Sequence, residues 1–196
     1  MKRAARTSMS SHRCCAGLTL FELMVVMIVV AVLAAIAVSP PMRGMLARQH
    51  VEGMHAELLT DLRLARSEAL QRSGNSTSVA VTFGANADVS CYTIHVVVPG
   101  VVCDCTRAPG DVCLPAAPGQ ELKSMQYPRA AGFSVAASSP SGPSVVFSPP
   151  KGLAAPDGLV IDVQGTLSGQ LRTSLSALGV PRVCSPDGSI RGVASC

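Results

Sequence analysis

A single carboxylate, Glu22, lies near the start of an apolar segment that carries no other charge through Val38. A charged side chain within a membrane span costs about 2.5–3.5 kcal/mol on insertion scales, so a chain retains one where another group recovers that cost. A carboxylate can do so by pairing with a cation, and a low dielectric makes this pairing strong and an unpaired carboxylate costly. Glu22 is therefore the first residue for which the sequence predicts a function.

Cysteines form the second set of reactive side chains, and six of the eight follow residue 90. They are Cys91, Cys103, Cys105, Cys113, Cys184 and Cys196. In an oxidising compartment, six cysteines predict up to three disulfides, for which the sequence permits fifteen connectivities. Cys184 and Cys196 are isolated from the others and are expected to close a C-terminal loop, which would stabilise the fold by about 3 kcal/mol.

The other four cysteines are then expected to pair among themselves. Zinc binding by these four is the alternative, but Cys-x-Cys is poor spacing for a zinc ribbon, and an oxidising compartment removes free thiols. The histidines add no ligand pattern, because His50 and His55 are neither three nor four residues apart. His95 falls in a predicted strand, where a half-exposed position is expected. No Ser-His-Asp order, paired carboxylates or phosphate loop is present, so the sequence predicts neither an enzyme nor a cofactor.

The sequence before the apolar segment has no acidic residue and carries four basic ones, Lys2, Arg3, Arg6 and Arg13. Basic residues beside a span favour the cytoplasmic side of a membrane. We therefore expect a cytoplasmic N-terminus, a single pass through a bacterial inner membrane, and an oxidising periplasm around everything after about Pro41. The alternative is a secretory signal peptide that is cut near Ala35-Ile36-Ala37.

The formal net charge of +4 comes from these four residues, since the whole chain has 16 basic and 12 acidic side chains. Without them the chain is formally neutral, so its overall charge does not indicate a nucleic-acid-binding head. Aromatic residues make up 3% of the chain and none of them is Trp. The core is therefore expected to consist mainly of Val, Leu, Ala and Met.

A second helix-like segment follows Ser39-Pro40-Pro41, where the prolines predict a kink or a short non-helical stretch. Its apolar residues recur at intervals of three or four and so form one face of a helix. They are Val51, Met54, Leu58, Leu62, Ala65 and Ala69. We therefore expect one helix from about Leu18 to Arg72, interrupted near Pro40, apolar in its first half and amphipathic in its second. Ser73-Gly74-Asn75 is expected to end it.

Short strand-like runs, separated by clusters of Pro, Gly and Ser, follow the helix and can cover its apolar face. They are residues 77–83, 91–98, 133–136, 145–147, 159–163 and 171–175. The predicted fold is α+β: a long N-terminal helix, transmembrane in its first half and amphipathic in its second half, packed on an antiparallel β-sheet head.

The segment Gly17-Leu18-Thr19-Leu20-Phe21-Glu22-Leu23 resembles the class III signal of type IV pilins and type II secretion pseudopilins. The resemblance implies cleavage between Gly17 and Leu18 by a prepilin peptidase, N-methylation of Leu18, and assembly with other pilins or pseudopilins in a filament. It also implies that Glu22 serves assembly by pairing with the methylated N-terminal amine of a neighbouring subunit. The expected organisation is a leader over 1–17, the pilin helix over 18–75 and a β-rich periplasmic head over 76–196.

Three further segments are similar to the FimT/GspH group of minor pilins and pseudopilins. They are Ala65-Arg66-Ser67-Glu68-Ala69 within 62–72, the cysteine order 91, 103, 105 and 113, and the end of the chain from Gly179 to Cys196. This resemblance implies a FimT-like minor pilin that is incorporated into a type IV pilus and acts in its assembly. The H-type minor pseudopilin of a type II secretion system is the alternative.

Some FimT-like proteins carry a C-terminal Gly-Arg-x-Arg motif that helps to capture DNA, and the matching residues here are Gly179, Val180, Pro181 and Arg182. The resemblance makes Arg182 a candidate DNA contact, which Arg191 and Arg172 could supplement on one face. Val180 replaces the first arginine of the motif, and few phosphate contacts on a neutral head predict weak binding. The alternative is that Arg182 is a solvated charge at the end of a strand.

Overall fold

The structure is a computed structural model that describes residues 19–37, 40–115 and 120–196. The predicted cleavage site at Gly17 and Leu18, and the predicted methylation of Leu18, lie outside the described residues. The chain divides into two compact units, one ending at Met42 and the other comprising Arg43–Cys196.

The first unit contains helix α1, Leu20–Ala37, in which Glu22 is the one charged residue. Its remaining residues are apolar on every side of the helix, as the sequence predicts for this segment. Leu18 and Val38, the two ends of the predicted apolar segment, lie outside the described residues. Among the described residues, no helix has both the length and the apolar character that crossing a membrane requires.

Helix α2, Pro40–Gln71, begins at a proline and is followed by a short 3₁₀ turn, η1, Arg72–Asn75. Proline is favoured in the first turn of a helix because its missing N–H would be unpaired there in any case. The two prolines therefore lie in the first turn of α2, and the residues of the predicted interruption just before them lie outside the described residues. Ser76 adopts a left-handed conformation with a φ of 51° at the end of η1, close to the predicted stop.

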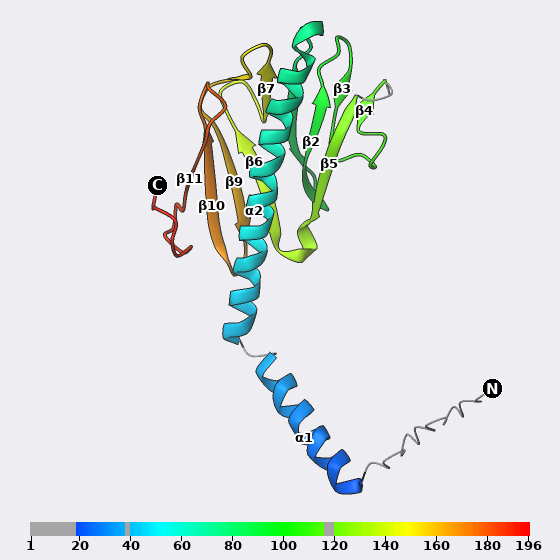
Figure 1. Ribbon diagram of the computed structural model, residues 1–196, viewed down its shortest axis with the longest axis vertical. Coiled ribbons are helices and arrows are strands. Elements are labelled where there is room, and N and C mark those ends of the chain that lie inside the picture. Colours follow the sequence, from blue (N-terminus) through cyan, green and yellow to red (C-terminus); the bar gives the residue numbers. More distant parts are fainter. Residues whose placement is uncertain (1–18, 38–39, 116–119) are drawn as a thin grey trace, which may run out of the picture. The chain divides into compact units, whose positions relative to one another are not determined.

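Most strands form two antiparallel sheets in the second unit (Figure 1). The five-stranded sheet has the order β5-β2-β1-β7-β8, with β1 Val79–Ala85, β2 Val89–Val96, β5 Glu121–Pro128, β7 Ser144–Ser148 and β8 Leu153–Ala155. The four-stranded sheet has the order β11-β10-β9-β6, with β6 Phe133–Ser138, β9 Leu159–Gly165, β10 Gly169–Leu175 and β11 Pro181–Cys184. A small hairpin pairs β3, Val102–Cys103, with β4, Cys113–Leu114, and a 3₁₀ turn, η2, spans Arg129–Ala131.

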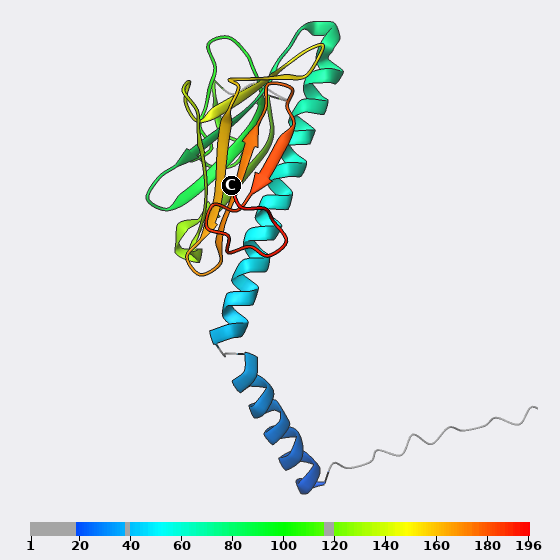
Figure 2. The same cartoon turned by 90° about the vertical axis from the view of Figure 1, so that its left-hand side faces the viewer.

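Helix α2 lies along one face of the sheets, and all six residues of the predicted apolar stripe are buried there (Figure 2). They pack in one core with residues of both sheets, including Tyr92 and Phe147 from the five-stranded sheet and Leu159 and Ile161 from the four-stranded one. Each fully buried side chain of this kind contributes about 1.5–3 kcal/mol relative to its exposed state. The predicted α+β fold, with an antiparallel head against the helix, is confirmed.

All six predicted strand segments correspond to observed strands, but β5 was not among them. The register explains why: Lys123 lies opposite Ile94 and Glu121 opposite His95, which leaves Leu122 in a bulge. Lys123 therefore occupies an inward-facing position that a sequence pattern assigns to an apolar residue. The short strands β3, β4, β8 and β11 were also not predicted, because two to four residues are too few to show an alternation.

Candidate functional site

Glu22 lies in the first turn of α1, and Thr19 caps this turn. The backbone N–H of Glu22 donates to Thr19 Oγ1 at 3.2 Å, and the N–H of Leu23 donates to the Thr19 carbonyl at 3.1 Å. Threonine at the cap and glutamate three residues later form the sequence pattern of a capping box. A negative charge is also favourable at this end of a helix. Thr19 was not among the predicted residues, although its Thr-x-x-Glu spacing before an apolar run was the signal.

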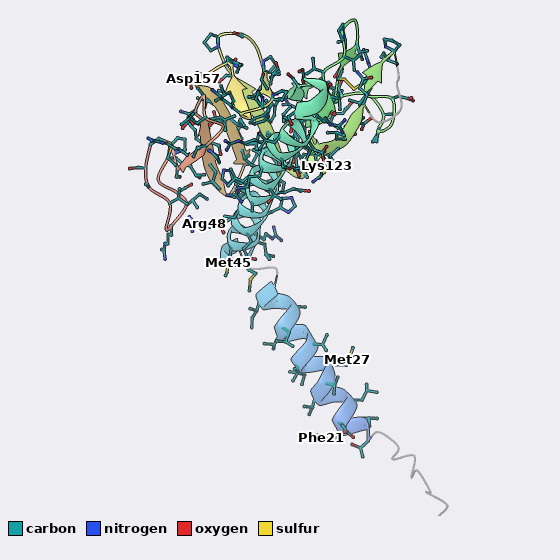
Figure 3. The ribbon with its side chains drawn as sticks, turned by 45° about the horizontal axis from the view of Figure 1, so that its top comes forward. Phe21, Met27, Met45, Arg48, Lys123 and Asp157 are labelled. Atoms are coloured by element: carbon teal, nitrogen blue, oxygen red, sulfur yellow. A yellow bond between two sulfur atoms is a disulfide. The ribbon has the colours of Figure 1, made fainter. Side chains whose placement is uncertain are left out.

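The Glu22 side chain makes no hydrogen bond or ion pair with any residue that the structure describes. The large apolar side chains around it are exposed from Leu20 to Ile36, each by at least 43%. Figure 3 shows Phe21 and Met27 projecting from different sides of α1. An exposed apolar surface of this extent requires a cover, and the carboxylate within it requires a cation. The chemistry of α1 therefore suits an apolar environment in which a neighbouring group supplies one positive charge.

One disulfide fastens the segment 101–114 onto β2, and a second closes the hairpin within this segment. Cys91 of β2 is bonded to Cys105, and Cys103 is bonded to Cys113 across the β3–β4 hairpin. The Gln126 side chain of β5 adds two hydrogen bonds of 2.6 Å, to the carbonyls of Cys105 and Arg107. Strand β2 is thereby covered on both faces, by α2 on the Tyr92 side and by this segment on the Cys91 side.

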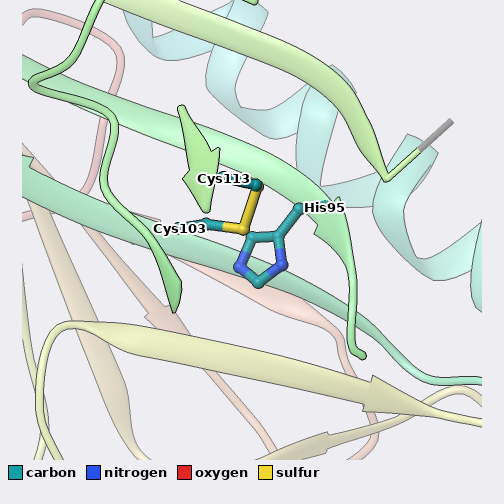
Figure 4. A group of neighbouring side chains, drawn as sticks. All are labelled: His95, Cys103 and Cys113. Atoms are coloured by element: carbon teal, nitrogen blue, oxygen red, sulfur yellow. A yellow bond between two sulfur atoms is a disulfide. The ribbon is translucent and has the colours of Figure 1, made fainter. Parts of the chain in front are cut away.

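His95 lies beside the Cys103–Cys113 disulfide, and the ligand atoms of the three residues are within 4.8 Å of one another (Figure 4). Both sulfurs are held in the disulfide, so they offer no thiolate to a metal in this state. The His95 ring is half-buried and its Nε2 lies 3.0 Å from Thr82 Oγ1. The oxidised pairing thus favours the disulfide interpretation of these cysteines over the zinc alternative.

The third disulfide joins Cys184, at the end of β11, to Cys196. Inside the loop it closes, buried Ser185 donates to the Gln170 carbonyl and to Asp187 Oδ1. Hydrogen bonds from Ser189 and Ser185 hold the pKa of the Asp187 carboxyl below its usual value. The loop is therefore fixed both to strand β10 and to itself.

A buried polar cluster links α2 to the five-stranded sheet. The Tyr92 hydroxyl donates to Asp61 Oδ2 at 2.7 Å, and Lys123 Nζ lies 2.8 Å from the Asp61 carboxylate and 3.1 Å from Glu57 Oε1. The Asp61 side chain is 4% exposed, whereas that of Lys123 is 32% exposed. Burial, then the hydrogen bond to Asp61, raises the pKa of Tyr92. Burial lowers the pKa of Lys123, but its bonds to Asp61 and Glu57 outweigh this and raise it.

Neither this cluster nor the role of His55 was predicted from the sequence. Both Asp61 and His55 occupy the apolar face of α2, because they lie three or four residues from Leu58 or Val51. A polar residue inside such a stripe was the available signal, since a buried polar group requires a partner. For His55 the partner is Thr173 on β10, with Nε2 and Oγ1 2.7 Å apart.

The folded head is expected to lose stability as the pH falls below about 6.5, the unfolded pKa of histidine. Burial lowers the pKa of His55, so protons bind the unfolded chain first, and each such histidine costs up to about 1.4 kcal/mol per pH unit. Burial also lowers the pKa of His95. Urea unfolding of the Arg43–Cys196 unit at pH 7.5 and pH 5.0 measures this loss of stability. The loss should be smaller in the His55→Gln variant. An unchanged pH dependence in that variant would contradict the assignment.

The three candidate DNA-contacting arginines are in different states. Arg172 forms a two-pronged ion pair with Asp162 on the neighbouring strand, with Nε–Oδ1 at 2.8 Å and Nη2–Oδ2 at 2.9 Å. Its charge is therefore largely neutralised. Arg182 and Arg191 are exposed, and their side chains form no hydrogen bond or ion pair with the described part of the chain. In the β10–β11 register, Arg182 lies opposite Ser174, and Ser174 is two residues from Arg172 along β10.

Two family models match the chain. The model described as the prokaryotic N-terminal methylation motif matches residues 12–38, and the model described as type II transport protein GspH matches residues 56–179. No curated protein and no solved structure matches the chain. The first match covers Glu22 and its cap, and the second covers the buried cluster and both sheets up to the turn before β11. The chain therefore belongs to the GspH family and is a type IV pilin-like minor pilin or pseudopilin.

Proposed function

We propose that this protein is a FimT-like minor pilin that is incorporated into a type IV pilus and acts in its assembly. The observation that carries the proposal is the Glu22 carboxylate, which has no partner among the described residues and lies in the first turn of an otherwise apolar, exposed helix. The precursor is held in the bacterial inner membrane by α1, with its N-terminus in the cytoplasm and its head in the periplasm. Other pilins are its partners in the filament.

The transfer from lipid to filament explains why a carboxylate is retained in α1. In lipid the charge of Glu22 has no counter-ion and raises the cost of insertion. In a filament, the spans of neighbouring subunits replace the lipid, and the methylated amine at residue 18 of a neighbour supplies the missing cation. A charge pair in such a low-dielectric environment is strong, and the carboxylate is costly if the pair does not form. Glu22 therefore favours the assembled state over the membrane pool.

An H-type minor pseudopilin of a type II secretion system is the alternative function. The match to the type II transport protein GspH family favours it, whereas the similarity of the C-terminal segment 179–196 to FimT-like proteins favours the pilus. Deletion of the gene separates the two, because loss of a minor pilin reduces the number of surface pili and loss of a pseudopilin blocks protein secretion. Intact piliation with blocked secretion would overturn the proposed pilus function.

Maturation is expected to remove residues 1–17. The basis is the Gly-Leu-Thr-Leu-Phe-Glu string after an acid-free basic leader. N-terminal sequencing and mass spectrometry of protein co-expressed with a prepilin peptidase should give a chain that starts at N-methylated Leu18. Protein made without the peptidase is the control and should retain the leader. A chain that starts after Ala37 would instead indicate a secretory signal peptide.

Weak DNA binding is proposed as a secondary property, because Arg182 and Arg191 are exposed and unpaired within the described residues. Each neutralised phosphate contributes a salt slope of about −0.9 for duplex DNA, so two or three contacts give a shallow slope and low affinity. Titration of a labelled duplex at two salt concentrations should show this, with most binding lost in Arg182→Ala and binding strengthened in Val180→Arg. Tight binding at physiological salt that is insensitive to Arg182 would place the DNA contact elsewhere.

A further inference from the structure

A groove of about 490 Å³ lies between α2 and the turn that leads from β10 to β11. Arg63, Arg66, Ser67 and Leu70 of α2 form one wall, and residues 179–181 form the other. Both walls belong to the Arg43–Cys196 unit. Neither the disulfides nor the buried Asp61 cluster involves these residues, although residues 179–181 also belong to the segment that matches the DNA-capture motif.

Two glycines lie close to the Arg66 side chain in the groove. A Cβ atom at Gly152 would come within 3.0 Å of Arg66 Nε, and one at Gly179 would lie 3.4 Å from Arg66 Cδ. Both glycines have positive φ values, 62° and 69°, which favour glycine at these positions. The Arg66 stem is therefore enclosed by backbone, and its guanidinium has little freedom to leave the groove. A fixed charge of this kind binds a partner with a smaller loss of conformational entropy than a mobile one.

The groove is cationic and its charges are unpaired. Arg66 Nε is buried and has no hydrogen-bond partner, Arg63 forms no ion pair with a described residue, and none of the lining residues is acidic. The nearest acidic residues along α2 are already paired, Asp61 with Lys123 at 2.8 Å and Glu68 with Arg72 at 3.2 Å. The like charges of Arg63 and Arg66, three residues apart on one helix face, repel each other. An anion bound between them would replace this repulsion with attraction to both. The groove is therefore complementary to a negative charge.

Apolar side chains flank the two arginines. Leu70 is 39% exposed and Val180 is 49% exposed, and both line the groove with Pro181. Phosphates of a nucleic acid gain nothing from this apolar surface, whereas a peptide with a carboxylate between apolar side chains contacts both kinds of surface. The composition of the groove therefore favours a protein segment over a nucleic acid.

We propose that this groove binds an acidic segment of a neighbouring filament subunit, in which a carboxylate is flanked by apolar side chains. The proposal rests on the proposed function in a filament, because it is there that a neighbouring subunit is held beside the head. The carboxylate pairs with Arg63 and Arg66, and the apolar side chains pack on Leu70 and Val180.

The test measures peptide binding to the full chain in detergent micelles by fluorescence anisotropy. The probe is a labelled Ala-Leu-Glu-Leu-Ala peptide with blocked termini, and the same peptide with Gln in place of Glu is its control. The Glu peptide should bind about tenfold more tightly, because its hydrogen bonds to guanidinium are charge-assisted. Arg63→Gln, at an exposed site where folding is not at risk, should remove this difference, and Arg66→Gln should do the same. Arg129→Gln, outside the groove, should leave it intact.

Equal affinity for the two peptides, or a preference that survives Arg63→Gln, would overturn the proposal. Duplex DNA that binds through Arg63 and Arg66 more tightly than the Glu peptide would also overturn it and assign the groove to a nucleic acid. The assay requires no filament, so its failure can be distinguished from failure of the proposed function. The latter is measured separately, by incorporation of a Glu22→Ala variant into filaments.

Discussion

Replacing Glu22 by alanine should remove the protein almost completely from sheared filaments while leaving its amount in the membrane fraction unchanged or increased. Membrane insertion is not impaired, because the substitution removes a charge that costs about 2.5–3.5 kcal/mol in the span. Assembly fails because the variant can no longer pair with the N-terminal amine of its neighbour. The measurement is the ratio of this protein in sheared filaments to that in membranes, determined by quantitative immunoblotting.

Glu22→Gln is the matched control that separates charge from helix capping. Glutamine can replace glutamate in a capping box, so this variant retains the start of α1 and loses the negative charge. Thr19→Val has the opposite effect, because it removes the hydroxyl that accepts from the Glu22 N–H and keeps the carboxylate. We expect Glu22→Gln to behave like Glu22→Ala and Thr19→Val to assemble. The reverse pattern would show that Glu22 serves the helix rather than the filament.

Lys123→Met should destabilise the head by about 3 kcal/mol, because it leaves the buried Asp61 carboxylate with Tyr92 as its remaining partner. We take the low end of the range for broken buried pairs, since the Lys123 side chain keeps about a third of its surface in water. A domain of this size has roughly 5–15 kcal/mol of stability in total, so the loss is large. Urea unfolding of the Arg43–Cys196 unit measures it.

A triple variant provides the control for this prediction. Asp61→Leu, Tyr92→Phe and Lys123→Met together remove the side-chain polar atoms of the Tyr92–Asp61–Lys123 contact, so none of these three positions keeps an unpaired buried charge or hydroxyl. The free energy of unfolding of the triple variant should be much closer to the wild-type value than that of the single Lys123→Met variant. If the triple variant is less stable than the single one, the ion pair stabilises the head beyond the cost of its burial.

The helix and its buried face were predictable from the sequence, because packing on a sheet imposes an apolar repeat of three and four residues. The stripe from Val51 to Ala69 is buried at every predicted position. The polar residues on the same face were not interpretable, because their partners Thr173, Tyr92 and Lys123 lie 31 to 118 residues away in the chain. Which of these pairs forms depends on strand register, which no local pattern specifies.

Glu22 in α1 was easier to predict from the sequence than the state of the arginines in the head. Glu22 is evident from the sequence, because one charge in an apolar segment is unusual wherever the segment lies. The state of Arg172 is not evident, since its neutralisation depends on the pairing of β9 with β10, which places Asp162 opposite it. The place of Arg63 and Arg66 in a groove is likewise not evident from the sequence. Their place in a groove depends on the turn at 179–181 and on the two glycines that enclose Arg66.

Strand β5 forms an edge of the five-stranded sheet, and Lys123 within it points inward to α2. An exposed sheet edge can recruit a strand from another molecule, and an inward-pointing charge on the edge strand hinders such pairing. A foreign strand that displaced β5 would also leave Asp61 without its cation. The same lysine that fastens the helix to the sheet thus protects the heads against edge-to-edge aggregation.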